Sequence, residues 1–116
     1  ETYDFIVSHS VFHYFKDLDY AKDVLVRMIQ KSNKKIGIFD INNEEKKEQY
    51  YLLRMKGMDK QEYKQKYQEL EHLFYEKSWF EKMAKEFNLK ISIFDQTFEN
   101  YLNSSLRFNV IMEKNR

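Results

Sequence analysis

The chain has 116 residues, enough for one domain or for part of one, and its 20 Lys and Arg residues nearly balance 19 Asp and Glu residues. The net charge of +1 argues against a basic nucleic-acid-binding surface, and a sequence with no Cys and only two Gly excludes thiolate metal sites and Gly-rich phosphate-binding loops. No apolar run approaches the roughly 20 residues that span a membrane, so no membrane partner is expected. The balanced charge argues against a nucleic-acid partner, and the lack of a secretory signal pattern and of Cys leads us to expect a cytoplasmic protein.

The first predicted element is a strand from about Tyr3 to Ser8, because Phe5-Ile6-Val7 is a continuous apolar run of the kind that is covered on both faces. A helix is expected from Leu18 to Lys31, with Asp17 as its N-cap and apolar residues at helical spacing. Lys35 to Ile41 forms a second, largely apolar strand. Strand, helix and strand in this order predict a right-handed crossover between two parallel strands.

Residues 43–77 are predicted to form a helical insert. Glu44 to Leu53 has the pattern of a helix, capped by Asn42 or Asn43. A capping-box pattern then opens a second helix, which is expected to run from Asp59 to about Leu73.

The final part of the chain is predicted to contain a helix and two strands. Ser78-Trp79-Phe80-Glu81 has the pattern of a capping box and is expected to start a helix through Phe87, with Asn88 as its stop. Lys90 to Asp95 and Leu106 to Glu113 are strands. Only about ten residues separate them, which is too few for a helical crossover, so an antiparallel arrangement is expected.

This order of elements resembles the second half of the class I S-adenosylmethionine-dependent methyltransferases. Asp4-Phe5-Ile6-Val7-Ser8-His9-Ser10-Val11-Phe12-His13 is similar to the family's fourth-strand motif, and Ile36 to Asp40 resembles its fifth strand. His72-Leu73-Phe74-Tyr75, followed by Trp79 to Met83, is similar to the aromatic segment before its last helix. The resemblance implies an α/β fold that is the C-terminal half of a Rossmann-like sheet. The family's strand order is 3-2-1-4-5-7-6, with strand 7 antiparallel, and this chain would supply strands 4 to 7.

The resemblance also implies a function. The cofactor would be S-adenosylmethionine, with Ser8, His9 and Ser10 lining its methionine and sulfonium side, and the methyl group would pass to an O or N atom of a small molecule. The family's Gly-rich loop and ribose-binding acidic residue have no counterpart in residues 1–116. We therefore expect a fragment of a longer enzyme that is inactive alone, in which the insert at residues 43–77 forms part of an acceptor lid.

Histidine is the usual base near neutral pH, which makes His9, His13 and His72 the candidate catalytic residues. Each has a structural alternative: turn packing for His9, packing at a helix entry for His13, and a partly exposed helix position for His72. Their spacing does not predict a metal site, because nothing in the sequence places His72 beside the other two.

Other side chains are candidates for substrate binding. Three aromatic residues could offer π faces to a cation, although such residues more often belong to the core: Tyr14, Tyr75 and Trp79. Asp40 ends the second strand and could face the same crevice, or it could be a solvated strand end or a helix cap. Arg107 and Asn109 share one face of the last strand and are weaker candidates.

Two other functional classes are compatible with the sequence. The chain could be a non-catalytic α/β half-domain that acts as a scaffold and dimerises through the exposed edge of its first strand. It could also belong to a different nucleotide-binding α/β protein of similar topology, because a fold alone does not define a function.

Overall fold

The computed structural model describes residues 1–54, 72–96 and 104–115. In these residues the strands are β1 (Tyr3–His9), β2 (Ser32–Asn42), β3 (Leu89–Asp95) and β4 (Arg107–Lys114). The α-helices are α1 (Leu18–Lys31), α2 (Lys47–Arg54) and α4 (Lys77–Glu86). Short 3-10 helices lie at Phe12–Tyr14, Glu44–Lys46 and Ser104–Leu106.

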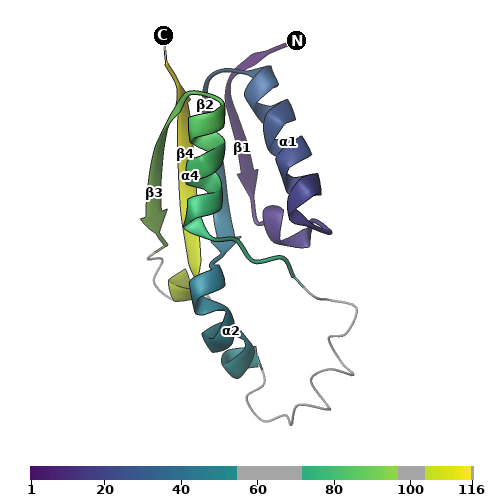
Figure 1. The fold of residues 1–116 in the computed structure, drawn as a ribbon, viewed down its shortest axis with the longest axis vertical. Coiled ribbons are helices and arrows are strands. Elements are labelled where there is room, and N and C mark those ends of the chain that lie inside the picture. The colour runs from purple at the N-terminus through teal and green to yellow at the C-terminus, as the bar shows by residue number, and fades with distance from the viewer. Residues whose placement is uncertain (55–71, 97–103, 116) are drawn as a thin grey trace.

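The four strands form one mixed sheet in the order β1-β2-β4-β3 (Figure 1). β1 and β2 are parallel and are joined through α1, as expected for a crossover unit. β4 lies between β2 and β3 and is antiparallel to both of them. The predicted α/β class and the antiparallel pairing of the last two strands are confirmed.

Helix α1 has the bounds that its sequence predicts. The carboxylate of Asp17 accepts a hydrogen bond from the backbone N–H of Tyr20 at 2.8 Å, which satisfies one of the unpaired donors of the first turn. Of its predicted apolar residues, Ala21, Leu25 and Ile29 are buried, whereas Leu18 at its start is 40% exposed. Local signals therefore determine both the start and the inner face of this helix.

The predicted capping box at Ser78 is wrong. Helix α4 begins at Lys77, and its N-cap is Glu76, two residues before the predicted N-cap; the side chain of Glu76 makes no capping hydrogen bond. The hydroxyl of Ser78 instead donates to the carboxylate of Glu76 at 3.1 Å. The predicted stop is confirmed, because Asn88 adopts a φ of 55°, in the left-handed region that ends helices.

The insert follows its prediction in part. Its first helix opens with a 3-10 turn, and the side chain of Asn43 is the cap, accepting from the backbone N–H of Glu45 at 3.0 Å. His72 to Phe74 are not helical, so the second predicted helix does not extend to Leu73. The rest of that predicted helix lies outside the described residues.

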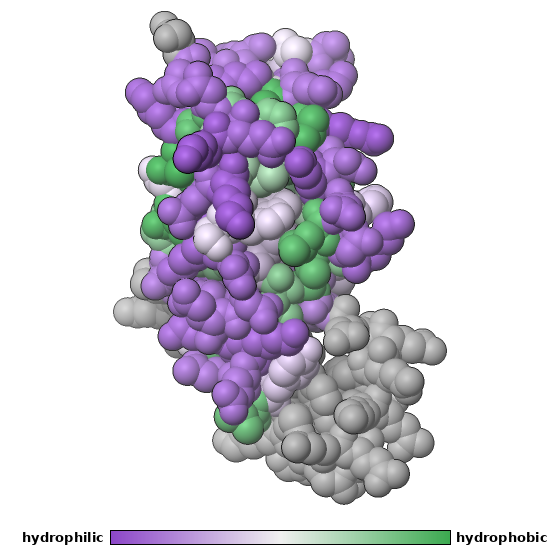
Figure 2. Space-filling model, viewed as in Figure 1, coloured by the Kyte–Doolittle hydropathy of each residue, from purple (hydrophilic) through white to green (hydrophobic). Residues whose placement is uncertain are grey.

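Helices α1 and α4 lie on the same face of the sheet (Figure 1). Their inner faces meet the sheet in one hydrophobic core, formed with these strand residues: Ile36, Ile38 and Ile41 of β2, and Phe108, Val110 and Met112 of β4. The outward surfaces of the two helices are mainly hydrophilic, and hydrophobic residues show between them (Figure 2). This pattern is typical of amphipathic helices that cover one side of a sheet.

The opposite face of the sheet has no helix among the described residues, and this changes the interpretation of β1. The first strand was expected to be covered on both faces, but its residues Phe5 and Val7 are 61% and 62% exposed. The reason is topological: β1 is an edge strand, and these two side chains point to the face away from α1 and α4. Alternation along the strand leaves Ile6 half-buried on the helix side.

Candidate functional site

Polar residues gather at the carboxyl ends of β1 and β2. Open α/β folds bind their ligands at this end of their parallel strands. The backbone N–H of Ser10 donates to the carbonyl oxygen of Phe39 at 3.1 Å, which ties the turn after β1 to β2. Ser10 and Asp40 both have left-handed backbones, with φ of 58° and 65°. Such values are uncommon outside Gly and are a recognised feature of functional sites.

Asp40 is the centre of a buried hydrogen-bonded group. Its carboxylate lies 3.1 Å from the guanidinium of Arg107 and accepts a hydrogen bond from the Ser10 hydroxyl at 2.5 Å. Its backbone N–H donates to the side-chain oxygen of Asn109 at 2.8 Å. The side chains of Arg107 and Asp40 are only 4% and 1% exposed, so the ion pair neutralises two charges that would be costly to bury alone.

His13 completes this group, and we call Ser10, His13, Asp40, Arg107 and Asn109 the polar cluster. The His13 ring is buried, and its Nδ1 atom has no hydrogen-bond partner. Burial, together with the nearby Arg107 guanidinium and the His72 ring, lowers the pKa of His13 to about 4, against smaller opposing effects from Asp40. His13 is therefore neutral near pH 7.

His72 lies beside His13, which the sequence gave no reason to expect. The two rings have centroids 5.0 Å apart, and Tyr14 packs edge-on against His72 at 5.2 Å. The phenol of Tyr50 lies 2.9 Å from Nδ1 of His72. The backbone N–H of Leu73 donates to the carbonyl oxygen of His13 at 2.8 Å, which fixes this end of the insert against the turn after β1.

His9 occupies the rim of the site. It is the last residue of β1 and is exposed, whereas Ser8 and Ser10 on either side of it are half-buried. Its Nδ1 atom lies 3.0 Å from the hydroxyl of Ser10, so it connects to the polar cluster through that serine. Ser8, His9 and Ser10 therefore form a continuous segment at the carboxyl end of β1.

Two predicted substrate-binding residues pack with the hydrophobic core: Tyr75 is buried in it, and the partly buried Trp79 lies against it. The phenol of Tyr75 donates to the carbonyl oxygen of Phe12 at 2.8 Å, and burial raises its pKa. Trp79 packs edge-on against Tyr75 at 5.3 Å and against Phe80 at 4.8 Å. Both side chains match the structural alternative, in which aromatic residues at these positions pack the fold.

Arg107 has a larger part in the site than its sequence position indicates. An Arg in a strand whose centre is apolar is a usable signal, because fully buried Arg is rare unless it is paired. The sequence offers many acidic residues as its partner, and only the pairing of β2 with β4 selects Asp40. Tyr50, which contacts His72, was not anticipated at all.

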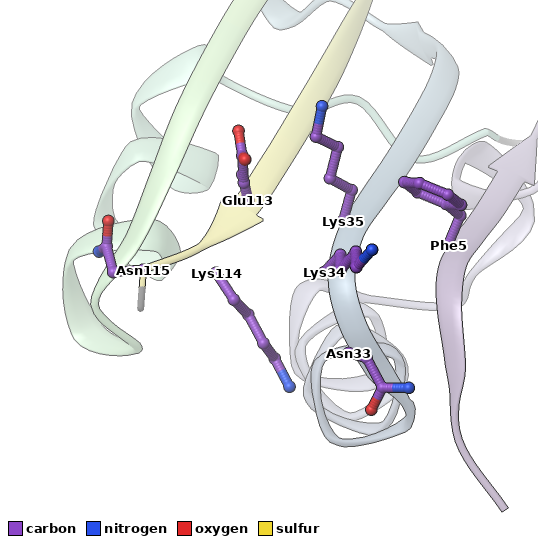
Figure 3. A pocket seen from close by; sticks show the side chains of 7 residues that line it. All are labelled: Phe5, Asn33, Lys34, Lys35, Glu113, Lys114 and Asn115. Atoms are coloured by element: carbon purple, nitrogen blue, oxygen red, sulfur yellow. The ribbon is translucent and has the colours of Figure 1, made fainter.

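A separate hollow of about 410 Å³ lies at the other end of the sheet, on the face without helices (Figure 3). Its lining residues are Phe5, Asn33, Lys34, Lys35, Glu113, Lys114 and Asn115. Lys34 pairs with Asp4 at 3.8 Å, and Lys114 donates to the backbone oxygen of Ser32. Because two of its three cations have partners and the hollow lies away from the polar cluster, we do not assign it to the functional site.

Within residues 1–54, 72–96 and 104–115, no group of three or more His, Asp or Glu side chains is arranged to hold a metal ion. In the same part of the chain, no helix is both long and apolar enough to cross a membrane. The chain matches no protein-family model, no curated protein and no solved structure in the three comparisons.

Proposed function

We propose that this chain is the C-terminal half of a methyltransferase domain that transfers a methyl group from S-adenosylmethionine to a small molecule. One observation carries the proposal: the strand order β1-β2-β4-β3, with a parallel first pair and an antiparallel β4. This is the order 4-5-7-6 with strand 7 antiparallel that the resemblance of the sequence implies. The polar cluster also lies at the carboxyl ends of the parallel strands, where this class of fold binds its ligands.

The polar cluster would lie beneath an acceptor site, because Asp40, Arg107 and His13 are buried and only Ser10 is half-buried. The pair of Asp40 with Arg107 is neutral overall and His13 is neutral near pH 7, so the cluster places no net charge under such a site. A polar, uncharged acceptor would fit it better than a strongly charged one, because each unpaired buried charge carries a large desolvation cost. His9, at the exposed rim, and Tyr14, which is 68% exposed, have side chains open to a bound molecule.

The described residues fit one side of the cofactor. Ser8, His9 and Ser10 lie at the edge of the sheet, and the left-handed turn at Ser10 bends the chain away from the end of β1. When bound, the cofactor supplies an electrophilic methyl group on a sulfonium ion. Residues 1–116 contain no Gly-rich loop for the rest of the cofactor, so tight binding is proposed for a longer polypeptide only.

Calorimetric titration of S-adenosylhomocysteine into the longest natural polypeptide that contains these residues tests the proposal, with ATP as the control ligand. We expect S-adenosylhomocysteine to bind and ATP not to bind. His9→Trp should weaken binding of S-adenosylhomocysteine at least about tenfold, a change of about 1.4 kcal/mol, because the larger side chain would occupy the space proposed for the sulfur end of the ligand. Ser92→Trp, at an exposed position on β3, is the matched control. Binding of ATP without S-adenosylhomocysteine would instead support a different nucleotide-binding protein.

A second candidate function follows from the uncovered face of β1. Tyr3, Phe5 and Val7 are all more than half exposed on an edge strand, which is a surface that commonly pairs with another chain. A scaffold that dimerises through this edge would elute as a homodimer in sizing with light scattering. Val7→Lys should abolish that dimer, whereas Phe94→Lys on β3 should not. A monomeric wild-type chain with a cooperative melt would contradict this candidate.

A further inference from the structure

We propose that Arg107, Asp40 and Ser10 form a relay that fixes the tautomer of His9 and leaves its Nε2 atom unprotonated, ready to act as a base. Four side chains are linked in a row: Arg107 lies 3.1 Å from Asp40, Ser10 lies 2.5 Å from Asp40, and His9 lies 3.0 Å from Ser10. This inference rests on the proposed function and names the residue that takes the proton of the acceptor.

The direction of each hydrogen bond follows from counting protons. Asp40 is ion-paired with a guanidinium, so its carboxylate accepts and does not donate. Ser10 has a single hydroxyl proton, and the 2.5 Å contact with Asp40 uses it. The Ser10 oxygen can then only accept from His9, which requires that Nδ1 of His9 carries the ring proton. In a neutral imidazole the other nitrogen, Nε2, is then unprotonated.

The relay is held rigidly at its inner end and is open at its outer end. Arg107 and Asp40 are almost fully buried, and Asn109 also holds the backbone N–H of Asp40. Ser10 is half-buried and His9 is exposed. The charge pair is therefore shielded from water, while the base is accessible to an acceptor. Arg107, Asp40 and Ser10 act through His9 and are positioning residues.

The relay implies that the acceptor carries a proton on the atom that is methylated, as in a hydroxyl group. The acceptor oxygen forms a bond to the methyl carbon, and its proton passes to Nε2 of His9. The electron pair of the broken carbon–sulfur bond returns to the sulfur of the sulfonium donor, which becomes a neutral thioether. His9 ends this step as an imidazolium, and its Nδ1–H still donates to Ser10, next to the negative charge of Asp40.

Long-range ¹H–¹⁵N NMR of the 116-residue chain tests the relay directly, because the shifts of the ring nitrogens report which of them carries the proton. The spectra are recorded about two pH units above the ordinary pKa of histidine, so that the rings are neutral. We expect His9 to carry its proton mainly on Nδ1. Ser10→Gly should remove this preference, and Gly tolerates the left-handed backbone at this position, so folding is retained.

Ser8→Ala is the matched control, since it removes the neighbouring serine hydroxyl, and it should leave the spectrum of His9 unchanged. A wild-type His9 that carries its proton on Nε2 would overturn the relay, and so would a Ser10→Gly spectrum identical to that of the wild type. The experiment uses no cofactor. A failed tautomer measurement therefore leaves the calorimetric test standing, and a failed titration leaves the relay standing.

Discussion

Burial of neutral His13 predicts that the folded chain loses stability in mild acid. The folded state holds its pKa at about 4, whereas the unfolded chain has the ordinary value of 6.5. Between these two values the unfolded state binds the proton and the folded state does not, so stability rises with pH. The free energy of unfolding is therefore unaffected by His13 well above pH 6.5, and it falls as the pH drops from 6.5 towards 4.

The size of this effect follows from the two pKa values. At pH values well below 4, the full pKa shift lowers the free energy of unfolding by about 3 kcal/mol, because each pKa unit is worth about 1.4 kcal/mol. About 2 kcal/mol of it should already be lost at about pH 5. With a typical urea dependence of about 2 kcal/mol per molar, the unfolding midpoint would move by about 1 M.

Urea unfolding followed by fluorescence measures this loss, since the single Trp of the chain, Trp79, packs against Tyr75 in the core. The variant His13→Gln has no group that titrates at this position, so it should lose about 2 kcal/mol less than the wild type between pH 7.5 and pH 5. His9→Gln retains His13 and is the matched control. An equal loss in the wild type and in His13→Gln would refute the assignment of the acid sensitivity to His13.

Two further predictions concern the packing of the fold and are measured by the same unfolding assay. Arg107→Met should lower the free energy of unfolding by about 3 to 5 kcal/mol, because it leaves Asp40 as a buried charge. Lys22→Ala should lower it by less than about 1 kcal/mol, because the 3.4 Å pair of Lys22 with Glu86 is exposed to solvent. Equal losses would contradict the role given to the buried pair. Phe80→Ala, at a fully buried position, should cost about 3 to 5 kcal/mol, and Phe94→Ala, 42% exposed, less than about 1 kcal/mol; a small loss at Phe80 would show that the core is centred elsewhere.

The polar end of the sheet shows where sequence patterns were sufficient and where they were not. Ser10 was a candidate through the family resemblance, His13 as a possible base and Asp40 as the end of a strand, and the structure brings the three together. The placement of His72 beside His13 was not predictable, because the length and path of an insert leave its return point open. Likewise, the sequence made Arg107 only a weaker candidate and did not identify the carboxylate that pairs with it.

Local physics in the sequence determined the elements. The side chain of Asp17 and the spacing of Ala21, Leu25 and Ile29 define α1 to the residue, because a cap and an apolar stripe act within a few turns of chain. The predicted cap of α4 was wrong because the hydroxyl of Ser78 bonds to Glu76, and the helix starts at Lys77 without a side-chain cap. Only the tertiary structure decided which face of β1 stays exposed and which charges meet at Asp40. These depend on pairing between segments distant in sequence, and no local pattern encodes that pairing.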